Sequence, residues 1–303
     1  MSFELTILGS NSALPTSNRY PTAQVLQVPG FCFLIDCGEG TQIQLRRNKI
    51  SFSKIRHIFI SHLHGDHYFG LIGLISTMNL MGIKTDLHIY AHSELKNLIQ
   101  PQLDFIRGEM TVNPVFHPLN FKKPQLIFES KKVEVLSFPV KHSLPTCGFL
   151  FKEKQKPANI RKEMIKAYNI PIAKIKEIKA GADFTCDDGQ VIANADLTVP
   201  ASKPKSYAFC TDTAFFPANA KIFNRVDLLY HEATFLEELK DLAQKTLHST
   251  AKEAGEMARI SDAGKLLIGH FSARFKDISR FTEEAREVFP NTEAATEGSK
   301  YNI

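Results

Sequence analysis

Residues 61–69 read Ser-His-Leu-His-Gly-Asp-His-Tyr-Phe, and this stretch says more about fold and function than any other part of the chain. It follows the apolar run 58–60, which is typical of the end of a buried strand. Four side chains of types that bind metal ions lie within six residues: His62, His64, Asp66 and His67. Imidazole nitrogens suit zinc, and a carboxylate among histidines is typical of hydrolytic metal sites. The stretch therefore predicts a metal site at the end of a strand.

The spacing within this cluster divides its members between two ions. His62 and His64 alternate on one face of an extended segment, so both can reach the same ion. Asp66 and His67 follow Gly65, where the chain can turn and direct them at a second ion. A lone histidine is more often an ordinary core or surface residue. Four histidines have no supporting constellation and receive no role: His57, His88, His92 and His117.

The composition is that of a soluble globular protein, with 43% hydrophobic and 23% charged residues in a chain of 303. This length suits one large domain or two ordinary ones. The first residues lack a basic and apolar leader, and no apolar run approaches the ~20 residues of a membrane span, so neither a signal peptide nor a membrane is expected. The five cysteines lack a CxxC spacing, which predicts a reduced, cytoplasmic setting.

The net charge of +5 is concentrated in one segment. Residues 152–180 carry nine basic and three acidic side chains, which leaves the rest of the chain at about −1. Such a basic segment favours a polyanionic partner. A solvated lysine-rich insertion without any partner explains the charge equally well.

Apolar runs between turn residues predict a fold of class α+β, an αβ/βα sandwich in which two packed mixed sheets are flanked by helices. Strands are expected at 4–8, 24–28, 31–36, 57–61, 87–91, 125–129, 132–140, 146–151, 196–199, 206–211, 228–230 and 265–268. Helices are expected at 40–47, 68–81, 93–99, 250–258 and 281–288. The whole chain, 1–303, reads as one domain with a basic insertion, containing short helices, at about 152–180.

Further metal ligands are expected where other predicted strands end. His142, Asp212 and His270 each follow a predicted strand. Strand ends hold side chains rigidly, and several of them at one edge can build a single site. A carboxylate such as Asp212 can bridge two ions ~3.5–4 Å apart.

The segment 62–67 is similar to the HxHxDH motif of the metallo-β-lactamase superfamily, whose members include lactamases, thiolesterases and nucleases. Other segments resemble ribonuclease Z, the tRNA 3′-processing endonuclease. They are the N-terminal loop 8–16, the segment 36–42, the short motifs 231–234 and 248–250, and the segment 270–275. The resemblance runs from about residue 5 to 298.

The resemblance implies a zinc-dependent endoribonuclease that leaves a tRNA 3′-hydroxyl and a 5′-phosphorylated trailer. It implies two Zn²⁺ ions per subunit, with these ligands: His62, His64 and His142 for one ion, Asp66, His67 and His270 for the other, and Asp212 between them. Asp66 would also accept a proton from the attacking water. His248 would protonate the leaving oxygen, oriented by Glu232. Without the resemblance, Glu232 and His248 read as a surface glutamate and a histidine at a helix start.

The resemblance also implies tRNA precursors as partners and a homodimer, in which the arm of one subunit grips the tRNA cut by the other. The insertion stands in the arm's place, with Lys174 and Lys176 as phosphate contacts, and Arg274 is a phosphate-binding candidate in the body. Many relatives have a Gly-Pro pair where this chain has the run 171–174 without it. A general phosphodiesterase or small-molecule hydrolase on the same fold is the alternative, and a non-catalytic RNA-binding module is a third.

Overall fold

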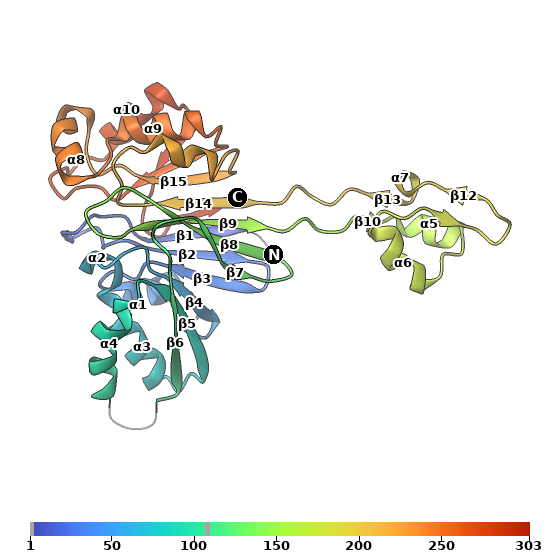
Figure 1. Ribbon diagram of the computed structural model, residues 1–303, viewed down its shortest axis with the longest axis horizontal. Helices are drawn as coiled ribbons and strands as arrows, with labels where there is room; N and C mark the ends of the chain where they lie inside the picture. Colours follow the sequence, from blue (N-terminus) through green and yellow to red (C-terminus); the bar gives the residue numbers. More distant parts are fainter. Residues whose placement is uncertain (1–2, 107–109) are drawn as a thin grey trace. The chain divides into compact units, whose positions relative to one another are not determined.

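The computed structural model describes residues 3–106 and 110–303, which form two compact units (Figure 1). The larger unit, called the body below, comprises Met1–Lys152 and Lys205–Ile303. The smaller unit, called the arm, comprises Glu153–Pro204. It contains nearly all of the insertion expected at 152–180 and continues for a further stretch of chain before the body resumes.

The first sheet of the body has its described strands in the order β18-β1-β2-β3-β4-β5-β6. Their bounds are β1 Glu4–Gly9, β2 Ala23–Val28, β3 Phe31–Ile35, β4 Ile55–Phe59, β5 Thr85–Ala91, β6 Val112–Pro118 and β18 Lys300–Asn302. The strands from β3 to β6 are parallel, whereas β18, β1, β2 and β3 pair in antiparallel fashion. Because β3 is buried on both faces, it reads in sequence as a continuous apolar run.

The second sheet has the order β17-β16-β15-β14-β9-β8-β7 among the described residues. Its strands are β7 Gln125–Glu129, β8 Val133–Pro139, β9 Cys147–Glu153, β14 Ser206–Cys210, β15 Leu228–Glu232, β16 Leu266–Gly269 and β17 Thr292–Ala294. The strands from β14 to β17 are parallel, and β9 joins β14 in antiparallel fashion. Both sheets are therefore mixed, as the sequence predicts.

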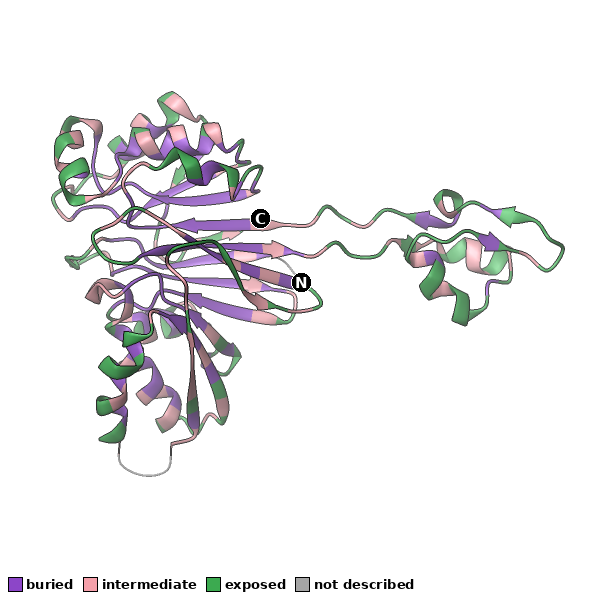
Figure 2. Cartoon of the chain, in the orientation of Figure 1, coloured by how far each residue is buried: buried purple, intermediate pink, exposed green. Residues whose placement is uncertain are grey.

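The two sheets pack face to face through aromatic side chains. Phe59 of the first sheet lies 5.5 Å from Phe149 of the second, measured between ring centroids. Helices α1 Thr41–Arg47, α3 Gly70–Leu80 and α4 Glu94–Asp104 pack on the outer face of the first sheet, and α9 Ala251–Ile260 and α10 Ser279–Val288 on that of the second. The strands are accordingly the most buried part of the body (Figure 2). The predicted sandwich of two sheets flanked by helices is confirmed.

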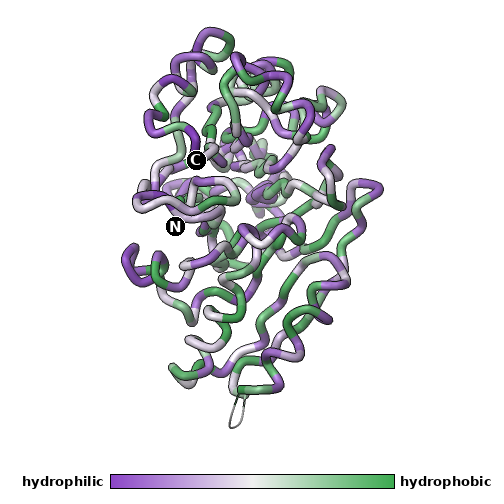
Figure 3. Tube along the Cα trace, turned by 90° about the vertical axis from the view of Figure 1, so that its left-hand side faces the viewer, coloured by the Kyte–Doolittle hydropathy of each residue, from purple (hydrophilic) through white to green (hydrophobic). Residues whose placement is uncertain are grey.

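Hydrophobic and hydrophilic residues alternate along much of the chain (Figure 3). In the outer helices α9 and α10 this mixture is expected, because one face of each helix is buried. Helix α9 begins with a capping box, in which the Thr250 hydroxyl accepts from the backbone of Glu253 and the Glu253 carboxylate accepts from the backbone of Thr250. The remaining short helices of the body are α2 Gly65–Tyr68, η1 Phe52–Lys54, η2 Pro217–Lys221, η3 Glu237–Leu239 and α8 Lys240–Thr246. The longest described helices have 11 residues, too few to cross a bilayer.

The arm has a small core of its own. Its elements are β10 Asn159–Ile160, α5 Lys162–Ala167, α6 Ile172–Lys179, β11 Phe184–Thr185, β12 Val191–Ile192, α7 Asn194–Leu197 and β13 Thr198–Val199. Five buried apolar side chains form the core: Ile170, Ile178, Phe184, Ile192 and Leu197. A cluster of this size holds the arm's fold and leaves most of its charged side chains in solvent.

Three sequence expectations need correction. The strand expected at 196–199 is present only in its second half, β13 Thr198–Val199. Its first half belongs to the helical turn α7, because the Asn194 side chain donates to the carbonyls of Ile178 and Ala182 and draws the segment into a turn. The helix expected at 68–81 is present as α3, Gly70–Leu80, preceded by the short helix α2, Gly65–Tyr68. The two are separated at Phe69, since the Gly70 amide donates to the Cys37 carbonyl at 2.9 Å instead of continuing the helix. Three strands of the two main sheets, β6, β17 and β18, were not expected at all.

Candidate active site

The site residues follow strands of both sheets, and three of them have unusual backbone angles. Asp36 follows β3, Asp212 lies just beyond β14, and His270 follows β16; their φ angles are +54°, +40° and +61°. Non-glycine residues rarely adopt this left-handed region, and such strain concentrates at functional sites. The surrounding structure therefore forces these side chains into one place at some cost in stability.

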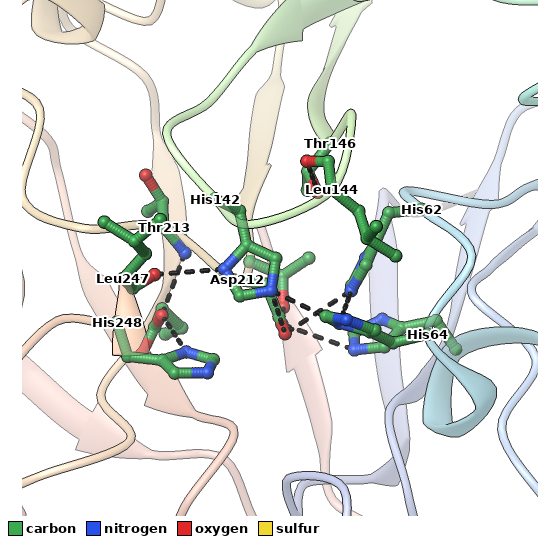
Figure 4. Close-up of polar contacts among 12 residues, drawn as sticks. His62, His64, His142, Leu144, Thr146, Asp212, Thr213, Leu247 and His248 are labelled. Carbon is green, nitrogen blue, oxygen red and sulfur yellow. Dashed lines mark hydrogen bonds and ion pairs between the residues drawn. The ribbon is translucent and has the colours of Figure 1, made fainter. Parts of the chain in front are cut away.

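The first group of ligand-type atoms brings together three histidines and one aspartate. His62 Nε2 lies 2.8 Å from His64 Nδ1, and His142 Nε2 lies 3.2 Å from the same His64 atom. One Asp212 oxygen, Oδ2, lies 3.6 Å from His62 Nε2 and 3.7 Å from His142 Nε2. Figure 4 shows these rings converging on the Asp212 carboxylate. The four side chains offer atoms within 4.8 Å of one another, close enough to share one ion.

A second group adjoins the first. Its members are Asp66, His67 and His270, whose ligand-type atoms also lie within 4.8 Å of one another. The other Asp212 oxygen, Oδ1, lies 3.3 Å from His67 Nε2 and 3.1 Å from His270 Nε2. Asp212 thus presents one oxygen to each group. All seven residues expected as metal ligands are brought together.

The other ring nitrogen of four of these histidines has a fixed partner. His67 Nδ1 lies 2.7 Å from Asp36 Oδ2, and His270 Nδ1 lies 2.8 Å from the Thr234 hydroxyl. His142 Nδ1 lies 3.1 Å from the Leu247 carbonyl, and His62 Nδ1 lies 3.1 Å from the Ser61 hydroxyl. Such outer partners fix the orientation and tautomer of a metal-binding imidazole. From sequence alone, Asp36, Thr234 and Leu247 had no assigned role.

Asp36 is fully buried and is held from three sides. Its carboxylate accepts from the Ser61 backbone at 2.7 Å, from the Ser61 hydroxyl at 2.9 Å and from His67. Burial raises the pKa of this carboxyl, and the neighbouring His67 opposes that rise. In sequence, segment 36–42 is only a family motif, whereas in the structure its first residue, Asp36, orients the His67 ring.

The atoms of the two groups suit divalent cations. Burial and the neighbouring His67 lower the pKa of His62 well below 6.5, which leaves a neutral imidazole with a free lone pair. Burial would also lower the pKa of His67, but the carboxylates of Asp212, Asp66 and Asp36 raise it well above 6.5. Within the described residues, the buried Nε2 atoms of His67 and His270 form no hydrogen bond, although Asp212 Oδ1 lies 3.3 Å and 3.1 Å from them. Excess carboxylate charge and unpaired ring nitrogens together fit a site for cations.

Glu232 and His248 form a pair next to these groups. His248 Nδ1 lies 2.7 Å from Glu232 Oε1, and the His248 ring lies 5.0 Å from the His142 ring, between centroids. Burial alone would lower the pKa of His248, but the Glu232 carboxylate raises it to about 9. Glu232 is fully buried and also accepts from the backbone amides of Thr213 and Thr234. The predicted pair is therefore close in space although 16 residues separate its members in sequence.

Hydrogen bonds around the segment 248–250 explain its residue types. The Ser249 hydroxyl donates to the Thr213 carbonyl at 2.7 Å, and Thr250 caps α9. Leu247, just before them, has φ = +58° and directs its carbonyl at His142. These contacts fix the backbone on both sides of His248.

A cavity of about 600 Å³ opens over both groups. Among its lining residues are Asp66, Asp212, His248, His270 and Arg274. The Arg274 guanidinium lies 5.9 Å from the centroid of the Phe235 ring, which orients it at the cavity wall. Lys174 and Lys176, the other expected substrate contacts, belong to α6 of the arm, where Lys174 is half-exposed and lies 2.9 Å from Glu177.

Relatives identify the family. Ribonuclease Z of Phocaeicola vulgatus is 47% identical over 301 residues, which is 99% of this chain and 97% of the relative. Ribonuclease Z of Parabacteroides distasonis is 45% identical over 99% of both chains. The chain belongs to the ribonuclease Z family. A family model described as the anti-Pycsar protein Apyc1 matches residues 3–160, so this half of the chain also belongs to that model's family.

Solved structures agree with membership of the ribonuclease Z family. The short form of human tRNase Z (ELAC1) superposes with a TM-score of 0.72 at 25% identity, covering 99% of both chains. YhfI from Bacillus subtilis, a metallo-β-lactamase fold protein, superposes with a TM-score of 0.68 at 17% identity and 99% coverage of both chains, a likeness of fold alone. The metallo-β-lactamase fold expected from the segment 62–67 is confirmed, and with it a divalent metal is implied.

Proposed function

We propose that this protein is a metal-dependent endoribonuclease that removes 3′ trailers from tRNA precursors, leaving a tRNA 3′-hydroxyl and a 5′-phosphorylated trailer. The observation that carries the proposal is the 2.7 Å contact between His248 Nδ1 and Glu232 Oε1, beside the His/Asp groups. A leaving ribose oxygen needs a proton, and this pair is built to supply one. Support for the substrate comes from the ribonuclease Z family of the full-length relatives and from the name of the human structure, tRNase Z.

The resident ions in this proposal are two Zn²⁺. His62, His64 and His142 would hold one and Asp66, His67 and His270 the other, with Asp212 as a further ligand. When bound, such ions activate a water for attack and neutralise charge on the scissile phosphate. Support comes from the two groups of ligand-type atoms and from the nitrogen-rich donor set, which suits zinc.

Two side chains carry out the two proton transfers of the reaction, one as the acceptor and the other as the donor. The Asp66 carboxylate accepts a proton from the attacking water. His248, protonated and held at Nδ1 by Glu232, donates a proton from Nε2 to the departing ribose 3′-oxygen. The phosphorus–oxygen bond breaks on the tRNA side, so the phosphate stays on the 5′ end of the trailer. Arg274 holds a phosphate oxygen beside the site.

The arm contributes binding in this proposal, and Lys174 and Lys176 are its phosphate contacts. Most of the nine basic side chains of 152–180 lie on its exposed surface, which suits a polyanion. We also propose a homodimer in which the arm of one subunit holds the tRNA cut by the other, on the strength of the family resemblance, and a cytoplasmic location. A single-subunit mass by light scattering under assay conditions would contradict the dimer.

The deciding experiment is incubation of the zinc-loaded protein with a 3′-extended tRNA precursor, followed by mapping of both new ends. We expect one cut next to the acceptor stem, a 3′-hydroxyl on the tRNA and a 5′-phosphate on the trailer. A general phosphodiesterase is the alternative, favoured by the family-model match that ends at residue 160, before Glu232 and His248. Hydrolysis of small phosphodiesters without any cut in the precursor would establish that alternative and overturn the proposal.

A further inference from the structure

One large apolar side chain lies in an unusual place beside the metal-ligand cluster. Phe69 is 63% exposed, although phenylalanine is among the residues most often buried, and it lines the same cavity as Asp66 and His248. It stands two residues after His67. Its ring adds little to the hydrophobic core, so its exposure at the mouth of the cavity calls for a role other than packing.

The Phe69 ring is held in place by its neighbours. A Cβ atom on Gly65 would lie only 2.1–2.6 Å from three atoms of the ring, so the ring occupies space that only glycine leaves free. The Phe69 amide donates to the Gly65 carbonyl at 2.9 Å, and the Tyr68 ring meets the Phe69 ring edge-on with centroids 5.0 Å apart. Gly70 packs so tightly on the Gly38 carbonyl that a Cβ there would lie 2.0 Å from the oxygen. The backbone on both sides of Phe69 is therefore fixed.

We propose that Phe69 is a base-stacking residue, whose exposed ring binds the nucleobase of a nucleotide next to the scissile phosphate. This inference rests on the proposed function, because it takes an RNA strand to cross the cavity. Every base has a flat aromatic face, so such a ring binds RNA without strong sequence preference. Arg274 lines the same cavity and is the phosphate contact that complements a stacked base.

Fixed position matters for the reaction as well as for affinity. A ring with two side-chain torsions, already held by Gly65 and Tyr68, loses little freedom when a base stacks on it. The stacked nucleotide then brings its phosphate to the same place over Asp66 and Asp212 in every encounter. Phe69 thus contributes to selecting a nucleic-acid strand over a small phosphodiester.

The test combines variants of Phe69 with substrates that lack one base. Phe69→Ala and Phe69→Leu remove the aromatic face, Phe69→Tyr retains it, and Phe105→Ala is the control, because Phe105 is 85% exposed and absent from the cavity lining. The substrates are a 3′-extended tRNA precursor and two versions of it, abasic at the last nucleotide before the cut or the first after it. Wild type cutting the intact precursor tests the proposed function separately.

We expect kcat/KM for the intact precursor to fall about 5- to 100-fold in Phe69→Ala and Phe69→Leu, with Phe69→Tyr and Phe105→Ala near wild type. One abasic precursor should be cut more slowly by wild type and suffer no further loss with Phe69→Ala. That precursor identifies the stacked base.

Four results would overturn the inference. Full activity in Phe69→Leu would mean that an apolar surface suffices. Equal losses by Phe69→Ala on intact and both abasic precursors would mean a structural role. A changed oligomeric state in Phe69→Ala, measured by light scattering, would make the ring a contact with a second copy. A wild-type protein unable to cut the precursor would remove the proposed function and this inference together.

Discussion

The active site in the body and the arm differ in how far their charged side chains are exposed to solvent. In the body, Asp36, Asp212 and Glu232 are buried, and each is surrounded by hydrogen-bond donors or imidazole rings. In the arm, Lys174 is half-exposed and makes a surface ion pair with Glu177. Bond cleavage requires groups held in a fixed geometry, whereas a grip on a polyanion requires charges in solvent that phosphates can reach. We therefore expect changes in the body to affect the chemistry and changes in the arm to affect binding.

Backbone strain shows the same contrast. The body places Asp36, Asp212 and His270 in the left-handed region, each within two residues of a strand end at the site. In the arm, the non-glycine residue described with positive φ is Asn169, a type that tolerates this conformation in turns. Strain at a rigid site is compensated by the rest of a large fold, and a unit with a five-residue core has little stability to offset it.

The largest effect is expected for Asp212→Ala. This change removes the oxygens that face both groups of ligand-type atoms, so we expect loss of at least one of the two bound ions and activity below detection. Zinc should then no longer raise the melting temperature as it does for wild type. Elemental analysis and thermal unfolding with and without zinc measure this. Asp262→Ala, at an exposed ion pair with Arg225, is the control. Two ions retained in Asp212→Ala would break the assignment.

The next effect is expected for His248→Ala, which removes the proton donor but no ligand of the proposed ions. Turnover should fall by ~10²–10⁴-fold while the metal content stays that of wild type. Glu232→Ala should act in the same direction, because it removes the partner of His248 Nδ1. His92→Ala, at a partly buried histidine outside the cluster, is the control. Metal loss in His248→Ala would show a structural role, and unchanged turnover would exclude the pair from the reaction.

Thr234→Val tests whether a residue that hydrogen-bonds to a proposed metal ligand is itself needed for zinc binding or activity. The Thr234 hydroxyl donates to Glu232 Oε2 at 2.6 Å and lies 2.8 Å from His270 Nδ1, so it links the proposed acid pair to a proposed ligand. Loss of such an outer partner should lower zinc affinity or activity by ~10–100-fold. Zinc affinity is measured by competition with a chelating dye. Thr234→Ser keeps the hydroxyl and should behave as wild type; equal losses in both variants would point to the methyl group instead.

The smallest effect per residue is expected in the arm. Lys174→Ala and Lys176→Ala should each weaken precursor binding and flatten its salt dependence, by roughly one unit of slope for every phosphate that a lysine no longer neutralises. Hydrolysis of bis(p-nitrophenyl) phosphate should stay unchanged. Replacing Glu153–Pro204 by a short linker should combine these losses and greatly weaken precursor processing. Equal loss of both activities would show that the arm supports the active site, and undiminished processing would make it a charged surface insertion.

The sequence by itself determined the local part of the site. The segment 62–67 concentrates its ligand-type side chains within six residues, so their proximity follows from chain geometry whatever the rest of the fold does. The apolar runs also predicted most strands, since a buried strand needs side chains of one type along its length. His142, Asp212 and His270 were expected because each follows such a run. The α7 turn was predicted wrongly because the polar contacts of Asn194 stabilise it, and apolar periodicity does not register such contacts.

Only the tertiary structure decided which side chains hold the site in place. Asp36 lies 31 residues from His67, Thr234 lies 36 from His270, and Leu247 lies 105 from His142. These pairings depend on strand order across two sheets, which the spacing of residues along the chain does not encode. The fixed position of Phe69 belongs in part to the same class, because the following Gly70 packs against the Gly38 carbonyl of a distant segment. The ligand-type residues that are neighbours in sequence could be recognised from the sequence alone. The partners that orient each of these groups could not, because only the folded chain brings them near.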